Sequence, residues 1–289
     1  MKKIFIISLL TTTFLLSANF ESTWKSIQKR PYITLPQYTV SYFKLFTNGI
    51  SNITHDANRT LNSHKDILPT FEKLAHPNGI CFKGFWNITQ ENNFSGYFKQ
   101  GTLAPIIVRI SSAMSNTKSG EIRSFGLAGK LFSTTQPKAN SANFFLIDDL
   151  GGTNAKFFSD ITLTNEPKLS LNFSVLNNFF YALEVSKVFS KLDMNPTIRQ
   201  LYEISQMDEK NKKIKTPKYL KLTLKTQTNH STKDFREELT LKKSQYLLFN
   251  ISVSENKKKW QQLGTIKLTT SICSFGCDKN LHFHHPKFQ

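Results

Sequence analysis

The stretch Ile80-Cys-Phe-Lys-Gly-Phe-Trp-Asn-Ile-Thr, residues 80–89, decides the expected fold. It is short and rich in aromatic and apolar residues, which is typical of a buried β-strand. The runs at 104–111 and 142–147 have the same character, and cleaner alternation of apolar and polar residues follows later in the chain. We therefore expect strands in each of these runs, the later ones being 219–226, 246–253 and 264–270.

Helices are expected in two other parts of the chain. Apolar residues recur at helical spacing over residues 51–73 and again over about 174–207, where Pro196 interrupts the pattern. The lysine runs at 209–215 and 256–259 fall between predicted elements and indicate solvated loops. Without an internal repeat or a linker, the simplest architecture is a single α+β domain that is mainly β, with helical insertions.

The first residues predict export. Two lysines after Met1 precede an apolar run over residues 4–16, and Ser17-Ala18 follows, which is the pattern of a signal peptide. The run is shorter than the roughly 20 residues of a membrane span, although an uncleaved N-terminal anchor is the alternative. We expect a signal peptide over 1–18, a periplasmic or secreted protein without stable membrane insertion, and an extended arm over 19–50.

The formal charge of +18 limits the classes of partner. Because 39% of the residues are hydrophobic, wholesale disorder is excluded, and the charge belongs to a folded protein. A basic protein suits nucleic acid, an anionic membrane or an acidic ligand. Export argues against nucleic acid, so we expect no nucleic-acid partner, and we expect most of the lysines to be solvated surface.

Three cysteines bear on the redox compartment. Cys273 and Cys277 could close a small loop in an oxidising compartment, which would leave Cys81 free. Cys81 lies between Ile80 and Phe82 and is expected to be an ordinary buried side chain.

Four short motifs occur in a fixed order: His76-Pro-Asn-Gly, Arg109-Ile-Ser, Gly126-Leu-Ala-Gly-Lys, and an asparagine ahead of Phe144-Phe145. In this order the chain resembles the catalase-related haem proteins, which include the haem catalases and smaller catalase-like proteins of bacterial periplasms. The resemblance covers about residues 70–160. It implies an antiparallel β-barrel of the catalase type in a single domain over 19–289, with an N-terminal arm over 19–73.

The resemblance also implies roles for individual residues. His76 corresponds to the distal histidine, which takes a proton from one peroxide oxygen and delivers it to the other. Ser111 corresponds to a serine that hydrogen-bonds this imidazole, and Asn140 to the asparagine that orients peroxide, with Asn143 as the alternative. Taken outside the motif, His76 would more simply be a packing or capping residue before Pro77.

Haem b, bound non-covalently, is the cofactor that the resemblance implies. Arg109 corresponds to an arginine that pairs with a haem propionate, whereas its alternative is an exposed position on the strand. Lys73 stands where relatives carry arginine and could serve the second propionate as a point charge. Phe157 or Phe158 could stack on the porphyrin, although each is as well explained as core.

The iron ligand is not identified by the sequence. In this family a tyrosine on a helix after the barrel binds the iron, and neither Arg nor Tyr occurs here after residue 260. We therefore expect that the C-terminal helical region is missing and that the chain is truncated before this tyrosine. His282, His284 and His285 could replace it, or could form a metal patch with Cys273 and Cys277.

Three functions follow, in order of preference. The first is an exported haem-binding peroxidase-like enzyme that reduces hydrogen peroxide or organic hydroperoxides in oxidative stress. The second is a degenerate catalase-like module that has no haem and acts by binding. The third is a metal-binding protein that uses the terminal His and Cys residues. The sequence leaves open whether the protein is an enzyme at all, which reductant it would use, and whether it forms a homo-oligomer.

Overall fold

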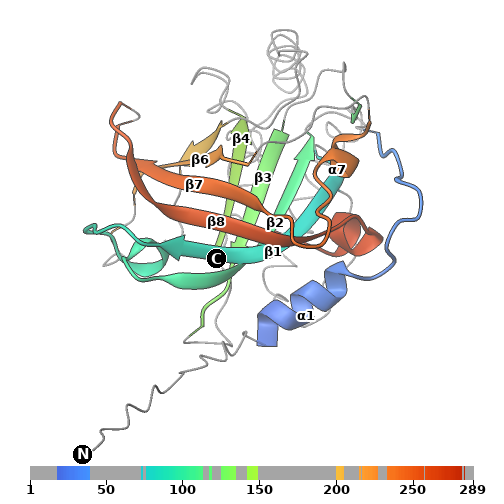
Figure 1. Ribbon diagram of the computed structural model, residues 1–289, viewed down its shortest axis with the longest axis horizontal. Helices are drawn as coiled ribbons and strands as arrows, with labels where there is room; N and C mark the ends of the chain where they lie inside the picture. The colour runs from blue at the N-terminus through green and yellow to red at the C-terminus, as the bar shows by residue number, and fades with distance from the viewer. Residues whose placement is uncertain are drawn as a thin grey trace, which may run out of the picture.

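Eight antiparallel strands form a closed β-barrel in the order β1-β2-β3-β4-β5-β6-β7-β8 (Figure 1). The computed structural model describes residues 18–39, 73, 76–112, 117–118, 125–134, 142–148, 200–204, 215, 217–226, 233–256, 258–281 and 283. The strands are β1 Gly79–Ile88, β2 Leu103–Ser112, β3 Phe125–Leu131, β4 Ala142–Asp148, β5 Gln200–Ile204, β6 Tyr219–Leu224, β7 Leu247–Ser254 and β8 Gln261–Ile272.

Four short helical pieces accompany the barrel in the described part of the chain. They are α1 (Ala18–Ile27), the 3-10 turn η1 (Gly96–Phe98), α7 (Phe235–Glu238) and the π-helical turn η2 (Gly276–Asn280). None of the described helices is both long and apolar enough to span a membrane.

Alternation along the strands places the apolar core inside the barrel. Every second residue of a strand points inward, so Phe82 and Trp86 of β1 meet Phe144 of β4 across the interior. The Trp86 ring lies 5.5 Å from the Phe98 ring and 5.9 Å from the Phe144 ring, centroid to centroid. The described interior is therefore filled by side chains, as in other small barrels.

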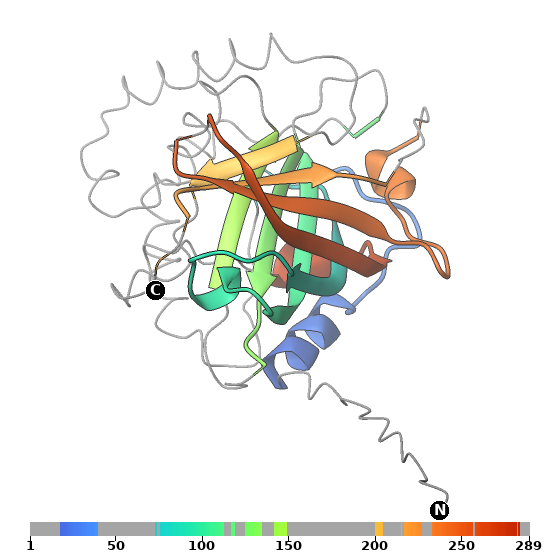
Figure 2. The same ribbon diagram turned by 60° about the vertical axis from the view of Figure 1, so that its left-hand side comes forward.

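The barrel closes where β1 pairs with β8, and glycines allow the two backbones to meet there (Figure 2). A Cβ atom on Gly84 would overlap the carbonyl oxygen of Lys267, and one on Gly264 would overlap that of Asn87. The ladder shifts register between Lys83 and Gly84, which marks a bulge at the seam.

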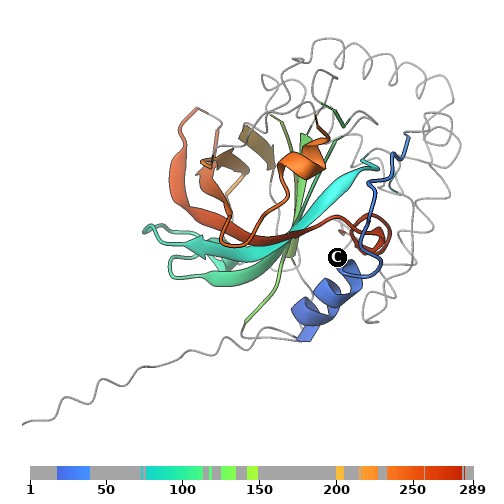
Figure 3. The ribbon, with the colours of Figure 1, turned by 45° about the vertical axis from the view of Figure 1, so that its right-hand side comes forward.

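The N-terminal arm begins as a helix, so the prediction of an extended arm is wrong for its first part. Phe20, Trp24 and Ile27 lie on one face of α1 and are buried against the outer surface of β1 and β2. Residues 28–39, in contrast, contain no helix or strand. Figure 3 shows α1 beside η2, below the strands.

The disulfide joins Cys81 of β1 to Cys277 of η2, across 196 residues. The prediction that Cys81 is an unpaired core residue, with Cys273 and Cys277 as the pair, is therefore wrong. The physical reason is that the barrel brings η2 against the outer face of β1, which no local spacing reveals. Cys273 keeps a free thiol, and burial raises its pKa to about 12.

The strand predictions are confirmed for β1, β2, β4, β6, β7 and β8. The prediction of a helix up to residue 207 is wrong at its end, because β5 (Gln200–Ile204) is a strand that pairs with β4 and β6. Pro196 interrupts the helical pattern four residues before β5, whose place in the sheet is set by its pairing with β4 and β6. The predicted helices over 51–73 and 174–199 lie outside the described residues, apart from Lys73, which is not helical.

Candidate functional site

His76 and Ser111 meet at the end of the barrel where β1 begins. The residues before β1 lead His76 onto the outer face of β2, where Ser111 lies opposite Gly79 in the ladder. The Ser111 hydroxyl oxygen and Nδ1 of His76 are 3.2 Å apart, within hydrogen-bond distance. The sequence pattern anticipated this pair, whereas its role in catalysis stays a prediction.

The surroundings of His76 favour the neutral imidazole. Burial, and second the positive charge of Arg109, lower the pKa of His76 to about 3, and a hydrogen bond with the Ser111 backbone opposes this shift. Part of the residue remains exposed to solvent. The imidazole is therefore neutral at ordinary pH, and the same shift makes it a weak acceptor of protons.

Arg109 is buried on the outer face of β2, with 3% of its side chain exposed. Nη2 donates to Asp278 Oδ1 at 2.7 Å and to the Pro77 carbonyl at 3.2 Å, and Nη1 donates to the His76 carbonyl at 3.0 Å. The third nitrogen, Nε, has no hydrogen-bond partner and lies over Gly79, where a Cβ atom would overlap the guanidinium. The motif needs glycine at residue 79 because the Arg109 guanidinium occupies the space of a Cβ atom there.

Asp278 is the centre of this cluster, and sequence reasoning missed it. It is 1% exposed and lies in η2, 169 residues from Arg109. Tyr32 donates to Asp278 Oδ2 at 3.2 Å, and burial and the Asp278 charge raise the pKa of Tyr32. The side chain of Lys73 donates to the backbone carbonyl of Asp278. The sequence around Asp278 matches no known motif, so its role is visible only in the folded structure.

The residues before β1 are fixed by a second set of contacts with the N-terminal segment. Asn78 accepts from the Tyr38 amide at 2.9 Å and donates to the Tyr38 carbonyl at 2.8 Å. Gln37 donates to Asp234, the N-cap of α7, at 3.0 Å, and Asp234 forms a buried ion pair with Arg236. The segment after α1 therefore crosses this end of the barrel and is held on both sides.

The other predicted site residues are only partly described. Asn140, Phe157, Phe158 and the histidines at 282, 284 and 285 lie outside the described residues. Asn143, the alternative asparagine, is buried on β4 opposite Lys130 of β3. Burial lowers the pKa of Lys130 to about 8.

The predicted metal patch loses one of its ligands. Cys277 is bonded to Cys81, so its sulfur is not a thiolate that could bind a metal. Among the described residues, no group of three or more His, Cys, Asp or Glu side chains could hold a metal ion.

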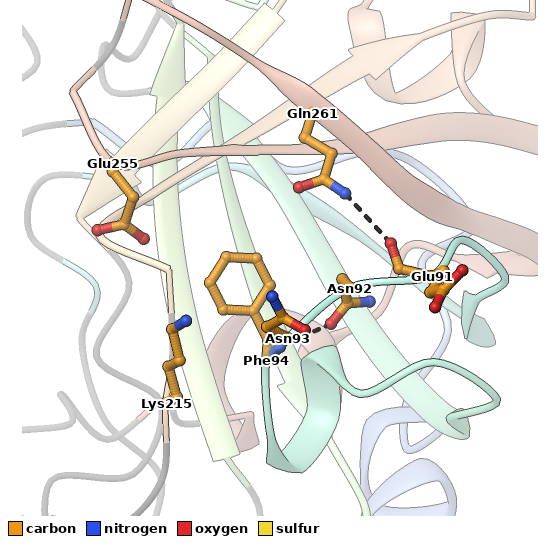
Figure 4. A pocket seen from close by; sticks show the side chains of 7 residues that line it. All are labelled: Glu91, Asn92, Asn93, Phe94, Lys215, Glu255 and Gln261. Atoms are coloured by element: carbon orange, nitrogen blue, oxygen red, sulfur yellow. Dashed lines mark hydrogen bonds between the residues drawn. The ribbon is translucent and has the colours of Figure 1, made fainter.

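A cleft of about 500 Å³ lies at the opposite end of the barrel (Figure 4). Its walls include Glu91, Phe94, Lys215, Glu255 and Gln261. β1 separates this end from His76 by ten residues, or about 30 Å of strand. The cleft is therefore not part of the His76 cluster.

Haem, which the sequence resemblance implies, does not fit the residues predicted to hold its propionates. Both terminal nitrogens of Arg109 are engaged by protein oxygens, and Nε faces the Gly79 backbone. Lys73 is directed to the same turn as Arg109, where it meets the carbonyl of Asp278. The carboxylate that Arg109 pairs with in this structure is supplied by the chain itself.

Comparison with known proteins gives matches in structure alone. No protein-family model matches the chain, and no curated protein matches it in sequence. A bacterial catalase is similar with a TM-score of 0.42 and 15% identity, over 78% of this chain and 52% of the catalase. A fungal catalase is similar with a TM-score of 0.38 and 15% identity, over 76% of this chain and 53% of the catalase. The chain spans about half the length of both catalases.

Proposed function

We propose that this protein is an exported catalase-like barrel protein that acts by binding and not by haem-dependent peroxide chemistry. The observation that carries the proposal is the ion pair between Arg109 and Asp278, with 2.7 Å between Nη2 and Oδ1. The side chain expected to anchor haem is committed to a partner within the chain.

The energetics of a buried ion pair support this interpretation. Removing one partner of such a pair leaves a buried charge uncompensated, which costs about 3–5 kcal/mol. A propionate would have to displace Asp278, and the displaced carboxylate, 1% exposed, would then need a new partner in the same place. Haem binding at Arg109 would therefore oppose the stability of η2.

Export is supported by the disulfide between Cys81 and Cys277, because disulfides persist mainly in oxidising compartments. The signal-like residues 1–18 point the same way. We expect protein from the cell envelope or the medium to begin near Asn19 on N-terminal sequencing. An intact Met1 on all of the protein would contradict cleavage near Ala18.

A haem-dependent peroxidase is the second candidate, and the His76–Ser111 pair favours it. Removal of a proton from a hydroperoxide requires a base near the oxygen, and the Ser111 contact at Nδ1 orients the imidazole that would take this part. In this alternative, haem would supply the redox chemistry and His76 the proton transfer.

Haem titration of the purified chain separates the two functions. The protein is produced without haem, mixed with haemin, passed over a gel-filtration column and examined by absorbance. We expect no stoichiometric Soret band in the protein fraction and no peroxide turnover above that of free haemin.

A Soret band that co-elutes with the wild-type protein and is weakened in Arg109→Leu would overturn the proposal. In that case His76→Ala should abolish peroxide turnover while haem stays bound. Lys25→Leu, at an exposed position of α1, is the matched control for loss of a positive charge.

A further inference from the structure

The outer face of β6, β7 and β8 is an exposed surface without a carboxylate. None of the three strands contains Asp or Glu. Inward-pointing neighbours such as Leu222, Ile251 and Ile266 belong to the core, so the residues between them point outward. Figure 1 views β7 and β8 from outside the barrel, and no described helix covers the middle of the pair.

One end of this face carries Lys225 and Lys267 on either side of Leu248. Lys267 lies opposite Leu248 in the ladder, and the amide of Lys225 donates to the Leu248 carbonyl at 2.8 Å. The two lysines are thus two strand spacings apart, about 10 Å. Lys242 and Lys243, in the turn before β7, are exposed at the same end.

The other end carries Lys221, Lys258 and Lys259. Lys221 pairs with Ser252 in the ladder, four residues along β7 from Leu248, or about 13 Å. Lys258 and Lys259 are exposed in the turn that joins β7 to β8, and they outnumber Glu255, the exposed carboxylate of the same turn. Within the described part of the chain, none of these lysines forms an ion pair.

The surface between the two basic ends is polar and uncharged. Thr223, Asn250 and Thr265 lie side by side across the three strands, in successive registers of the sheet. Nδ2 of Asn250 donates to Oε1 of Gln262 at 3.1 Å, which leaves the other amide and hydroxyl groups of the row available for a ligand. We call this surface, with its two basic ends, the basic strip.

We propose that the basic strip binds an extended acidic polysaccharide. Carboxylate or sulfate groups would lie against the lysines at both ends, and sugar hydroxyls would exchange hydrogen bonds with the threonines and Asn250 between them. The charge of the strip complements such a chain, and the net charge of +18 on the whole protein favours the encounter. The inference names a ligand for the proposed binding function and rests on it, although it uses residues on a different part of the barrel.

Two other polyanions suit the strip less well. Single-stranded nucleic acid needs aromatic faces on which bases can stack, but Nζ of Lys221 covers the Trp260 ring at 4.3 Å and Nζ of Lys267 covers the Tyr246 ring at 4.7 Å. A membrane surface needs apolar groups that can enter the lipid, and Tyr246 is the one large apolar side chain exposed on this part of the described surface.

Binding of polygalacturonate, an unbranched chain of uronic acid, tests the proposal by isothermal titration calorimetry with the full mature chain. We expect binding to polygalacturonate, none to neutral dextran, and an affinity that falls as salt is added. A quadruple variant should bind about tenfold more weakly or worse, because each lost charge removes part of the attraction. It combines Lys221→Gln, Lys225→Gln, Lys258→Gln and Lys267→Gln.

The control variant Lys25→Gln, Lys29→Gln removes two exposed charges near α1 and should bind within about twofold of the wild type. Circular dichroism checks that both variants are folded.

Absence of polygalacturonate binding, or equal weakening by the control variant, would overturn the inference. Tighter binding of oligo-dT, or of phosphatidylcholine vesicles containing phosphatidylglycerol, would overturn the choice of polysaccharide. Haem binding would refute the proposed function but leave this result unchanged.

Discussion

At the scale of single residues, the ion pair between Arg109 and Asp278 has the largest consequences for stability and function. Both side chains are almost fully buried, and they are 169 residues apart in the sequence. Asp278→Asn should lower the free energy of unfolding by about 3–5 kcal/mol, because it leaves the guanidinium buried without its counter-charge. Urea denaturation followed by tryptophan fluorescence measures this loss.

The double variant Arg109→Met, Asp278→Leu is the control for this effect. Replacing both partners of a buried pair with apolar residues is often neutral, so part of the lost stability should return, less the hydrogen bonds of Arg109 to the His76 and Pro77 carbonyls and of Tyr32 to Asp278. A single variant as stable as the wild type would show that the pair does not exist in solution.

Acid should destabilise the protein through His76. The pKa of this imidazole is 6.5 when unfolded and about 3 when folded, so below pH 6.5 the unfolded state binds more protons. The contribution of His76 to stability is complete above pH 6.5 and is lost progressively as the pH falls toward 3. Denaturation at a series of pH values should show a steeper loss for the wild type than for His76→Gln, which cannot titrate.

An NMR titration provides an independent check on His76. Its imidazole resonances should stay at their neutral positions down to about pH 5, whereas an exposed histidine titrates near 6.5. A midpoint near 6.5 would contradict the lowered pKa of His76 in the folded protein.

At the scale of elements, α1, β1 and η2 act as one unit, joined by the disulfide and a shared apolar cluster. Thiol titration of the unfolded, unreduced protein should find one free thiol, that of Cys273, and Cys273→Ala should reduce this to none. Three titratable thiols would exclude the disulfide. Replacing Cys81 and Cys277 together by Ala should cost about 2–5 kcal/mol of stability.

The elements that the sequence predicted are those whose patterns are local. Burial alternates over most of β6 and over residues 264–269 of β8, because one face meets the core and the other meets water. β3 was not predicted, because all seven of its residues are buried and its small residues conceal the alternation. The helix α1 was missed because only its contact with β1 and β2 distinguishes its buried face from an extended arm.

At the scale of the whole molecule, closure of the barrel depends on the seam between β1 and β8. Gly264→Ala should lower the free energy of unfolding by about 1–3 kcal/mol or more, because its Cβ atom would overlap backbone atoms of Asn87 and Ile88 that cannot rotate away. Gly101→Asn, at a turn with open space and a positive φ of 82°, should change stability far less. Thermal denaturation followed by circular dichroism compares the stabilities of the two variants. Equal stability would show that the backbone at the seam can shift to accept a Cβ atom at residue 264.

Some residues of the candidate site could be predicted from local sequence motifs, whereas others are identified only by contacts between distant parts of the chain. His76 and Ser111 were found because they belong to short motifs on β1 and β2, which pair directly. Asp278, which decides what Arg109 binds, carries no motif and comes from the other end of the chain. The role of Arg109 therefore could not be inferred from its own strand.

The sequence by itself determined six of the eight described strands and the motif residues, because alternation and short motifs depend on neighbouring positions, and its composition gives the excess of positive charge. The tertiary structure alone decided the partner of Cys81, the partner of Arg109 and the gathering of lysines on one face of the barrel. These contacts join residues that lie far apart along the chain, and barrel closure brings them together by burying apolar surface that no single segment can bury.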